Sequence, residues 1–172
     1  MRRRASSVGA CSVSFELTDG GRLVASAACK AEASLHVQLP VKAPKLWSSE
    51  SPYLYDLLLT VRDADGRVLE AVPQRFGFRR FEMKDGMMHL NGKRIVFKGV
   101  NRHEWNCRTG RAVTMEDMVS DVRAMKQNNI NAIRTCHYPD ASMIYRLCDE
   151  FGIYMIDETN LESHGSWDVA EF

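Results

Sequence analysis

The sequence predicts a chain of two parts, an antiparallel β-sandwich of the immunoglobulin-like kind followed by a parallel α/β sheet. In the first part, short apolar runs alternate with turn residues, which indicates strands and turns only. In the second part, apolar runs at residues 95–100, 130–133 and 153–156 are separated by two helix-like segments. Each of these runs leads into ionisable residues. Parallel α/β enzymes collect their catalytic groups in this way, at the carboxyl ends of the strands.

The first part is predicted to contain five strands. They are expected at residues 12–17, 23–28, 35–39, 54–62 and 68–72. Asp19-Gly20-Gly21 makes one turn, Pro40 ends the third strand, and Asp63-Ala64-Asp65-Gly66 makes a hairpin turn between the last two. A complete immunoglobulin-like sandwich has about seven strands. We therefore expect the amino-terminal edge of the sandwich to be missing.

The second part opens with a hairpin and a first helix. Asn91-Gly92 is a typical type I′ turn pair. Thr114 is expected to cap the helix with Asp117 as its capping-box partner, and Asn128-Asn129 to end it. The predicted buried face consists of Met118, Val122 and Met125.

The second helix is expected to begin with Asp140 as its amino-terminal cap and to end at Gly152, a residue that suits the left-handed position after a helix. One side of this helix carries Met143, Ile144, Leu147 and Phe151. A strand–helix–strand–helix–strand order with short connections predicts a parallel sheet with right-handed crossovers.

Composition excludes several classes of protein. The net charge of +1 gives no overall field to attract nucleic acid or an anionic membrane. No apolar run reaches the ~20 residues that span a bilayer, and the first ten residues are too rich in Ser and Gly for a signal peptide. The five cysteines are odd in number and form no C-x-x-C motif. We therefore expect reduced thiols and a cytoplasmic location.

The stretch at residues 130–139 is the centre of the predicted site. Arg134 and His137 leave this strand three residues apart. A buried arginine needs a carboxylate partner, and that pair is either functional or a structural salt bridge. His103, at the end of the preceding apolar run, either contacts a substrate or caps its loop.

Carboxylates follow the last apolar run. Asp157 and Glu158 are adjacent, so on a strand at most one of them enters the site. Glu162 and His164 are spaced to face one side of an extended segment. A carboxylate with an imidazole is compatible with Mg²⁺ or Mn²⁺, although two ligands are not a full shell and many such triplets bind nothing.

Taken together, these stretches resemble glycoside hydrolase family 2, and within it the β-galactosidase branch. Three motifs carry the resemblance: Asn131-Ala132-Ile133-Arg134-Thr135-Cys136-His137-Tyr138-Pro139, Gly99-Val100-Asn101-Arg102-His103-Glu104, and Asn160-Leu161-Glu162-Ser163-His164-Gly165. The segment from Pro44 to Tyr55 is similar to the end of that family's immunoglobulin-like domain. The glucuronidase branch usually has Lys where Arg102 stands and lacks the Glu-x-His triplet. Trp105-Asn106-Cys107 departs from the galactosidase pattern, which often continues with further histidines.

The resemblance implies an immunoglobulin-like domain over residues 1–78 and the first three βα units of a TIM (β/α)₈ barrel over residues 79–172. It also implies a retaining hydrolase acting on terminal β-D-galactosides. Its site residues would be Arg134, which orients and helps to ionise the nucleophilic carboxylate; His103, His137 and Asn160, which bind the sugar; and Glu162 and His164, which bind Mg²⁺.

The resemblance further implies that the chain is catalytically incomplete. A (β/α)₈ barrel takes roughly 250 residues, and the family's acid/base and nucleophilic glutamates lie on later strands. We therefore expect a truncated or internal part of a homo-oligomeric enzyme, which self-associates or needs the rest of its barrel. The alternatives are a sister glycosidase of the β-glucuronidase type and a non-catalytic carbohydrate-binding or interaction module.

Overall fold

The computed structural model describes residues 11–161 and divides into two units. The first unit comprises the chain up to Lys45 together with Tyr53–Phe78. The second comprises Leu46–Pro52 and the chain from Arg79 onward. The loop at residues 46–52, which the sequence places between two strands of the first part, thus packs with the second unit.

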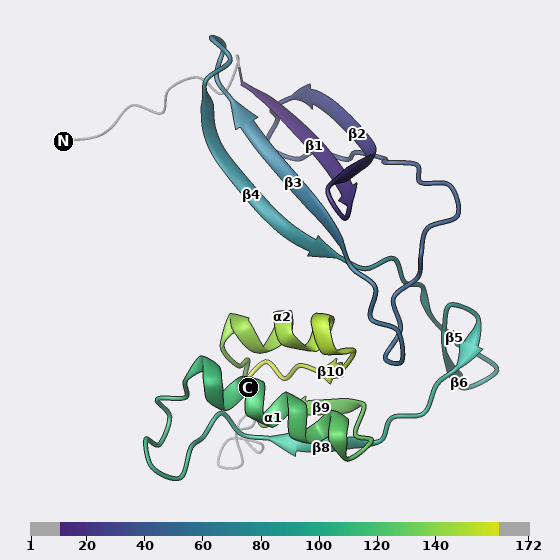
Figure 1. Cartoon of the computed structure of the whole chain (residues 1–172), viewed down its shortest axis with the longest axis vertical. Helices are drawn as coiled ribbons and strands as arrows, with labels where there is room; N and C mark the ends of the chain where they lie inside the picture. Colours follow the sequence, from purple (N-terminus) through teal and green to yellow (C-terminus); the bar gives the residue numbers. More distant parts are fainter. Residues whose placement is uncertain (1–10, 162–172) are drawn as a thin grey trace, which may run out of the picture. The chain divides into compact units, whose positions relative to one another are not determined.

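The first unit is built on a four-stranded antiparallel sheet in the order β2-β1-β3-β4 (Figure 1). The strands are β1 (Ser12–Asp19), β2 (Arg22–Lys30), β3 (Tyr55–Arg62) and β4 (Val68–Phe76). Val13, Leu17 and Tyr55 are buried on it. The predicted hairpin turn is confirmed: the N–H of Asp63 donates to the carbonyl of Arg67 at 3.0 Å, and the carboxylate of Asp63 accepts from the N–H groups of Asp65 and Arg67.

The predicted strand at residues 35–39 is wrong, because this segment pairs with no strand of the sheet. Leu35, Val37 and Leu39 are partly buried while the residues between them are exposed. The three apolar side chains line a cavity of about 590 Å³ whose opposite wall includes Leu57 on the sheet. The alternation of apolar and polar residues therefore arises because one side of this extended segment is apolar. It does not show that the backbone of the segment pairs with a strand.

The last strand of the first unit is longer than predicted. The sequence predicted residues 68–72, whereas β4 continues to Phe76 and pairs with β3 along its length. Pro73 lies inside this strand. Because β4 pairs only with β3, it is an edge strand of the sheet, where a residue without an N–H is tolerated.

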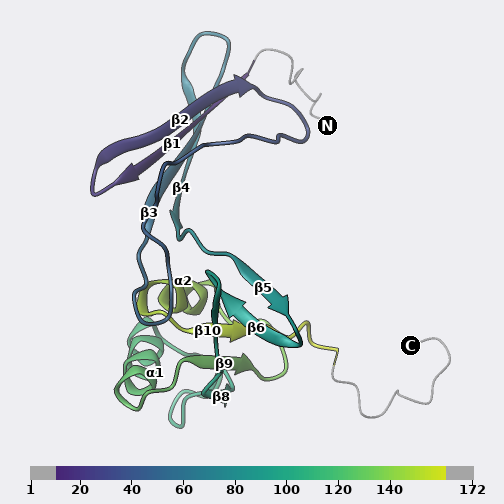
Figure 2. The same ribbon diagram turned by 90° about the vertical axis from the view of Figure 1, so that its right-hand side faces the viewer.

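The second unit contains a parallel sheet in the order β10-β9-β8, as predicted. Its elements are β8 (Gly99–Arg102), α1 (Met115–Gln127), β9 (Ala132–Thr135), α2 (Ser142–Phe151) and β10 (Tyr154–Ile156). The two helices lie side by side along one face of the sheet (Figure 2). Their shared core consists of Met118, Val122, Met125, Ile133, Ile144, Leu147, Cys148 and Ile153. No helix among residues 11–161 is both long and apolar enough to cross a membrane.

The strands β8 and β9 begin and end later in the chain than their apolar runs indicate. Residues 95–98 lie outside β8, which instead includes Asn101 and Arg102. Likewise β9 begins at Ala132 and includes Arg134. Polar residues can continue a strand when they pair with neighbours, and here Asn101 pairs with Arg134 across the two strands.

One helix begins as predicted and the other does not. The side chain of Thr114 accepts the N–H of Asp117, and the Asp117 carboxylate accepts the N–H of Thr114, so the capping box is confirmed. The prediction that Asp140 caps α2 is wrong: the capping position is Ala141, which has no side-chain cap. Asp140 is instead buried against an arginine. Gly152 ends α2 with a left-handed φ of +72°, as predicted.

A small antiparallel sheet precedes β8. It consists of β5 (Phe81–Lys84), β6 (Met87–Leu90) and β7 (Lys93–Arg94). Asn91 and Gly92, with φ of +52° and +78°, make the predicted turn between β6 and β7.

The segment Leu46–Pro52 is fastened to the carboxyl end of α2. The hydroxyl of Ser49 donates to the carbonyl of Gly152 at 2.6 Å, and the indole N–H of Trp47 donates to the carbonyl of Asp149 at 2.7 Å. The ammonium of Lys126 donates to the carbonyl of Ser49 at 2.9 Å. A Cβ on Gly152 would lie 2.4 Å from the carbonyl oxygen of Ser49, so only glycine permits this approach.

Candidate functional site

The ends of two neighbouring parallel strands bring the predicted histidines together. Arg102 on β8 pairs with Thr135 on β9, and the chain continues from these positions into His103 and into Cys136-His137. The two imidazole rings approach edge to face, with their centroids 5.6 Å apart. The peptide bond between Cys136 and His137 is cis.

Arg134 has the carboxylate partner that its position predicted. Its Nε donates to Oε1 of Glu158 at 2.5 Å, and Nδ1 of His137 lies 3.1 Å from Oε2 of the same carboxylate. The hydrogen bond from Arg134, assisted by that from His137, lowers the pKa of Glu158 below its usual value. Glu158 is therefore an ionised carboxylate held between a guanidinium and an imidazole.

Two contacts of His137 Nδ1 call for opposite positions of the ring proton. Nδ1 lies 3.1 Å from the Glu158 carboxylate and 3.2 Å from Nη2 of Arg134. An ionised carboxylate only accepts hydrogen bonds, whereas a guanidinium has several N–H groups to direct elsewhere. We therefore assign the proton to Nδ1 in the neutral ring, donating to Glu158, and the lone pair to Nε2.

Asp157 and Glu158 take separate roles, as predicted from their adjacency. Asp157 accepts hydrogen bonds from the hydroxyls of Thr135 at 3.1 Å and Tyr145 at 2.9 Å. Desolvation and the bond to Asp157 raise the pKa of Tyr145 to about 12. Only Glu158 joins Arg134.

A buried ion pair that the sequence did not reveal links the two loops that carry the histidines. The Nη1 of Arg102 donates to Oδ2 of Asp140 at 2.6 Å, with the two side chains 5% and 0% exposed. Nε of the same arginine donates to Asp121 on α1 at 3.1 Å. Burial raises the pKa of Asp140, and the hydrogen bond and charge of Arg102 oppose that rise. Glu104 adds a second link by accepting the N–H of Ala141 at 2.9 Å.

Tyr138 and Cys136 complete the surroundings of the histidines. The hydroxyl of Tyr138 lies 3.5 Å from Nδ1 of His103, and the guanidinium of Arg111 lies over the Tyr138 ring at 4.4 Å. The thiol of Cys136 is 1% exposed, and its sulfur lies 3.6 Å from Nη1 of Arg134. The sequence predicts Cys136 only to be a reduced thiol. Its position beside His137 at a strand end is the signal that could have placed it at this rim.

The structure thus brings together three of the predicted site residues, namely Arg134, His103 and His137. Asn160 lies in the exposed loop after β10 with a left-handed φ of +62°. Glu162 and His164 lie outside the described residues. The roles given to all six residues stay predictions.

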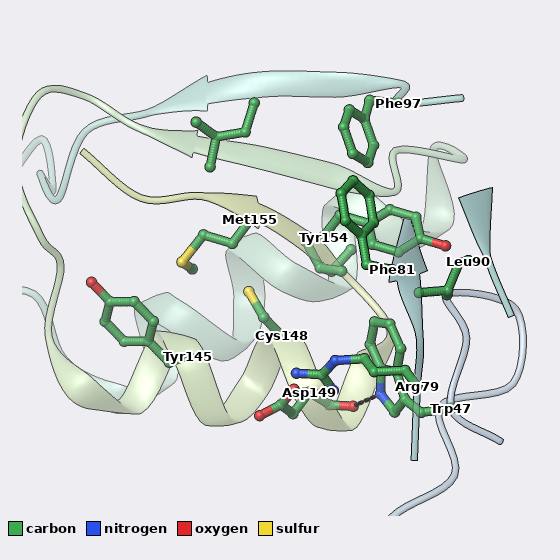
Figure 3. A pocket seen from close by; sticks show the side chains of 12 residues that line it. Trp47, Arg79, Phe81, Leu90, Phe97, Tyr145, Cys148, Asp149, Tyr154 and Met155 are labelled. Carbon is green, nitrogen blue, oxygen red and sulfur yellow. Dashed lines mark hydrogen bonds and ion pairs between the residues drawn. The ribbon is translucent and has the colours of Figure 1, made fainter. Parts of the chain in front are cut away.

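A cavity of about 670 Å³ lies elsewhere in the second unit and contains none of these six residues (Figure 3). Its wall is largely aromatic and apolar and includes Phe81, Phe97, Tyr154 and Met155. Trp47 and Arg79 border it, with the guanidinium 4.7 Å from the indole ring. The reactive groups on its wall are already committed, because Arg79 pairs with Asp149 at 3.1 Å and burial raises the pKa of the Cys148 thiol to about 12. This cavity is therefore a weaker candidate for chemistry than the charged rim.

Successive parallel strands and helices with charged groups at the carboxyl ends of the strands are typical of α/β enzymes, the (β/α)₈ barrels among them. Residues 81–171 match the family model "Glycosyl hydrolases family 2, TIM barrel domain", and residues 3–79 match "Glycosyl hydrolases family 2". The chain belongs to glycosyl hydrolase family 2. Its two units are accordingly a part of an immunoglobulin-like sandwich and a part of a TIM barrel.

Curated relatives share more than half of their aligned residues with this chain. A β-galactosidase of Halalkalibacterium halodurans is 58% identical over 88% of this chain and 15% of its own length. A β-galactosidase of Streptococcus thermophilus is 60% identical over 82% of this chain and 14% of its own length. A β-galactosidase large subunit of Leuconostoc lactis is 58% identical over 71% of this chain and 20% of its own length. The chain therefore spans about one seventh to one fifth of these proteins.

Solved structures show the same fold. A β-glucuronidase of Ruminococcus gnavus in complex with D-glucuronic acid superposes with a TM-score of 0.78 at 31% identity. The match covers 86% of this chain and 25% of that one.

Proposed function

We propose that this chain contributes part of the sugar-binding rim of a retaining β-galactosidase, an enzyme that hydrolyses terminal non-reducing β-D-galactose residues in β-D-galactosides. The observation that carries the proposal is the cluster at the carboxyl ends of parallel strands: two imidazoles with centroids 5.6 Å apart beside the Arg134–Glu158 pair. The names of relatives 58% and 60% identical to the chain support this substrate class.

Retaining glycosidases use two carboxyl groups about 5 Å apart, one as nucleophile and one as acid/base. We assign Arg134 to hold the nucleophilic carboxylate in its ionised form, because a neighbouring guanidinium lowers the pKa of a carboxyl group. His103 and His137 would bind sugar hydroxyls, and Asn160 would join them. No Asn-Glu pair, the family's acid/base motif, occurs in the 172 residues. We assign both catalytic glutamates to other strands of the barrel.

We also propose that Glu162 and His164 hold Mg²⁺ together with a further oxygen ligand. A carboxylate and an imidazole fit a hard cation that retains several waters. Bound there, Mg²⁺ would fix and partly neutralise carboxylates beside the sugar.

The proposal is tested by grafting this sequence into the Halalkalibacterium halodurans β-galactosidase in place of the 154 matched residues, which are 58% identical. The chimera is expected to hydrolyse a chromogenic β-galactoside. In it, His103→Ala and His137→Ala should each lower kcat/KM by roughly 10²-fold or more, as for lost transition-state contacts. A matched surface change, His89→Ala, should leave kcat/KM unchanged. A folded chimera whose activity is unaffected by both site substitutions would refute the assignment.

A β-glucuronidase is the second candidate, supported by the TM-score of 0.78 to the Ruminococcus gnavus enzyme. Recognition of a glucuronate carboxylate needs a cation that can reach the substrate. Arg102, at the position where glucuronidases usually carry Lys, is 5% exposed and committed to Asp140 and Asp121. We therefore favour the galactoside, and the chimera should cleave a chromogenic β-glucuronide far more slowly than the galactoside.

For the isolated chain we propose no turnover, because both catalytic glutamates are assigned elsewhere. In the described part of the chain, β8 and β10 each pair on one side only, and such edges favour association with further strands. We propose that the chain self-associates or binds the rest of its barrel, and that the whole enzyme is a homo-oligomer. A cytoplasmic location is supported by the free thiols of Cys11, Cys29, Cys107, Cys136 and Cys148.

A further inference from the structure

Three side chains at the rim form a set of metal-binding donors that is separate from the proposed Mg²⁺ pair. His103, Cys136 and His137 each offer one ligand atom, and these three atoms lie within 4.8 Å of one another. They come from two strand ends held in register by the pairing of β8 with β9. We propose that this His–Cys–His cluster binds a borderline divalent cation of the zinc class.

The type of donor decides which metal class fits. Two imidazoles and a thiolate suit Zn²⁺ or Co²⁺, whereas Mg²⁺ and Ca²⁺ prefer oxygen ligands. Three protein ligands also leave a fourth tetrahedral position for water or another small ligand. Binding releases the thiol proton of Cys136 to solvent as the sulfur–metal bond forms, and no electron is transferred.

The surroundings of the cluster are those that metal-binding histidines require. A histidine that binds a metal through one nitrogen almost always donates from the other, often to a carboxylate. His137 makes this contact, with Nδ1 lying 3.1 Å from Glu158. The Tyr138 hydroxyl, 3.5 Å from Nδ1 of His103, can act similarly on the second ring. In the tautomers that donate from Nδ1, both Nε2 atoms carry the lone pair that binds a cation.

Binding needs only a modest closure of the cluster. Metal–ligand bonds of 2.0–2.3 Å place neighbouring ligand atoms roughly 3.3–3.6 Å apart, so the atoms must approach by about 1 Å. His103 can supply this movement because it is exposed, while Cys136 is 1% exposed and fixed by packing. The nearby charge of Arg134 is balanced by Glu158, so the cation does not meet an uncompensated positive group.

The site has a consequence for the proposed activity, on which this step rests. His103 and His137 are the side chains assigned to the sugar, so a zinc-class cation on them would compete with a galactoside.

The test is a titration of the untagged, reduced 172-residue chain with Co²⁺ in the presence of excess Mg²⁺. Cobalt bound to a thiolate gives a charge-transfer band in the near ultraviolet, so the signal reports Cys136 and not an oxygen site. We expect saturation at one Co²⁺ per chain, displacement of the band by Zn²⁺, and no displacement by Mg²⁺. Absence of the band, or its loss on adding Mg²⁺, would overturn the proposal.

Variants locate the site. Cys136→Ser should abolish the band, and His103→Ala should weaken Co²⁺ binding by at least about tenfold. Because His103 is exposed, its replacement leaves the core intact even if the buried Cys136→Ser variant folds poorly. Cys107→Ser, at an exposed cysteine, is the matched control and should bind like the parent. A band that persists in Cys136→Ser or disappears in Cys107→Ser would refute the assignment.

A competition arm separates the two proposals. In the chimera, which supplies the rest of the barrel, galactose is expected to weaken Co²⁺ binding because both ligands use the same histidines. Unchanged Co²⁺ affinity of the chimera at saturating galactose would overturn the sugar subsite and leave the metal site standing, because the cobalt band requires no hydrolysis.

Discussion

The guanidinium of Arg102 donates to the carboxylate of Asp140 at 2.6 Å, and the two side chains are 5% and 0% exposed. This pair joins the last residue of β8 to the loop after β9. The N–H of Cys136 donates to the carbonyl of the same Arg102 at 2.9 Å. The backbone positions of His103 and His137, each close in sequence to one member of this network, are thereby held relative to each other, while the His103 side chain stays exposed.

Replacing one partner of this pair should be costly. Asp140→Asn leaves the Arg102 cation without its buried counter-charge and with the half-exposed Asp121 as its remaining carboxylate partner, and we expect the free energy of unfolding to fall by about 3–5 kcal/mol. Asp121→Asn removes a partner whose side chain is 46% exposed and should cost at most about 1 kcal/mol. Denaturant unfolding of the two variants measures both. Equal losses of unfolding free energy in the two variants would show that the burial of Asp140 does not make its ion pair more important than that of Asp121.

The double variant Arg102→Met/Asp140→Leu tests whether the Arg102–Asp140 ion pair raises or lowers the free energy of unfolding. Burial, together with the charges of Glu104 and Asp157, raises the pKa of Asp140 against the hydrogen bond and charge of Arg102, so the carboxylate is desolvated at a cost that its partner does not fully offset. Replacing both charges with apolar groups should therefore destabilise the chain less than Asp140→Asn alone. A double variant less stable than the single one would show that the ion pair is net stabilising.

Among the glycines of the second unit that lie within residues 11–161, Gly152 is expected to be the least replaceable. Gly152→Ala imposes a left-handed backbone of φ +72° on an L-residue and places a Cβ 2.4 Å from the carbonyl oxygen of Ser49. The first effect costs about 1–2 kcal/mol and the second adds about 1–3 kcal/mol. The matched control is Gly86→Ala, which has φ of +71° but no atom within 4 Å of the new Cβ. Calorimetry should show the larger loss in Gly152→Ala, and equal losses would exclude the steric effect.

The Arg134–Glu158 pair should make stability depend on acid pH. The pKa of Glu158 is lowered from its usual 4.5, mainly by the hydrogen bond from Arg134. A group with a lowered pKa in the folded state stabilises that state above its ordinary pKa, and this contribution is lost as the pH falls through the lowered value. The stability difference between the parent chain and Glu158→Gln should therefore be constant above pH 4.5 and shrink below it.

Unfolding of both proteins by denaturant at a series of acid pH values measures this difference, and a side-chain carboxyl titration by NMR gives the pKa of Glu158 directly. A Glu158 carboxyl that titrates above its usual pKa would contradict the ion pair.

Packing of the helices on the sheet gives a fifth prediction. Ile144 is 0% exposed in the shared core, so Ile144→Ala should lower the free energy of unfolding by about 2–5 kcal/mol. Ile156→Ala is the control because this side chain is 51% exposed, and its cost should stay within about 0.5 kcal/mol. Urea unfolding measures both, and a tolerated Ile144→Ala would mean that the core is not formed as described.

The local sequence pattern was sufficient to predict most of the helices, strands and turns. The capping box at Thr114, the left-handed end of α2 at Gly152 and the turn at Asn91-Gly92 are confirmed, because each depends on residues that are adjacent in the chain. The segment at residues 35–39 was mispredicted because strand pairing is a property of two segments, and alternation describes only one. Asp140 was misassigned as a cap for the same kind of reason, since its partner Arg102 is far away in the sequence.

The family, the three parallel strands with two helices between them, and the place of Arg134, His103 and His137 near strand ends all follow from the sequence alone. The folded chain was needed to show that Glu158 is the carboxylate on Arg134, that Arg102 is buried on Asp140, and that Cys136 lies beside the two histidines. A local pattern of apolar residues is enough to locate a strand and the residues that follow it. Which charged groups and metal-binding donors meet depends on how the ends of separate strands lie beside one another in the sheet.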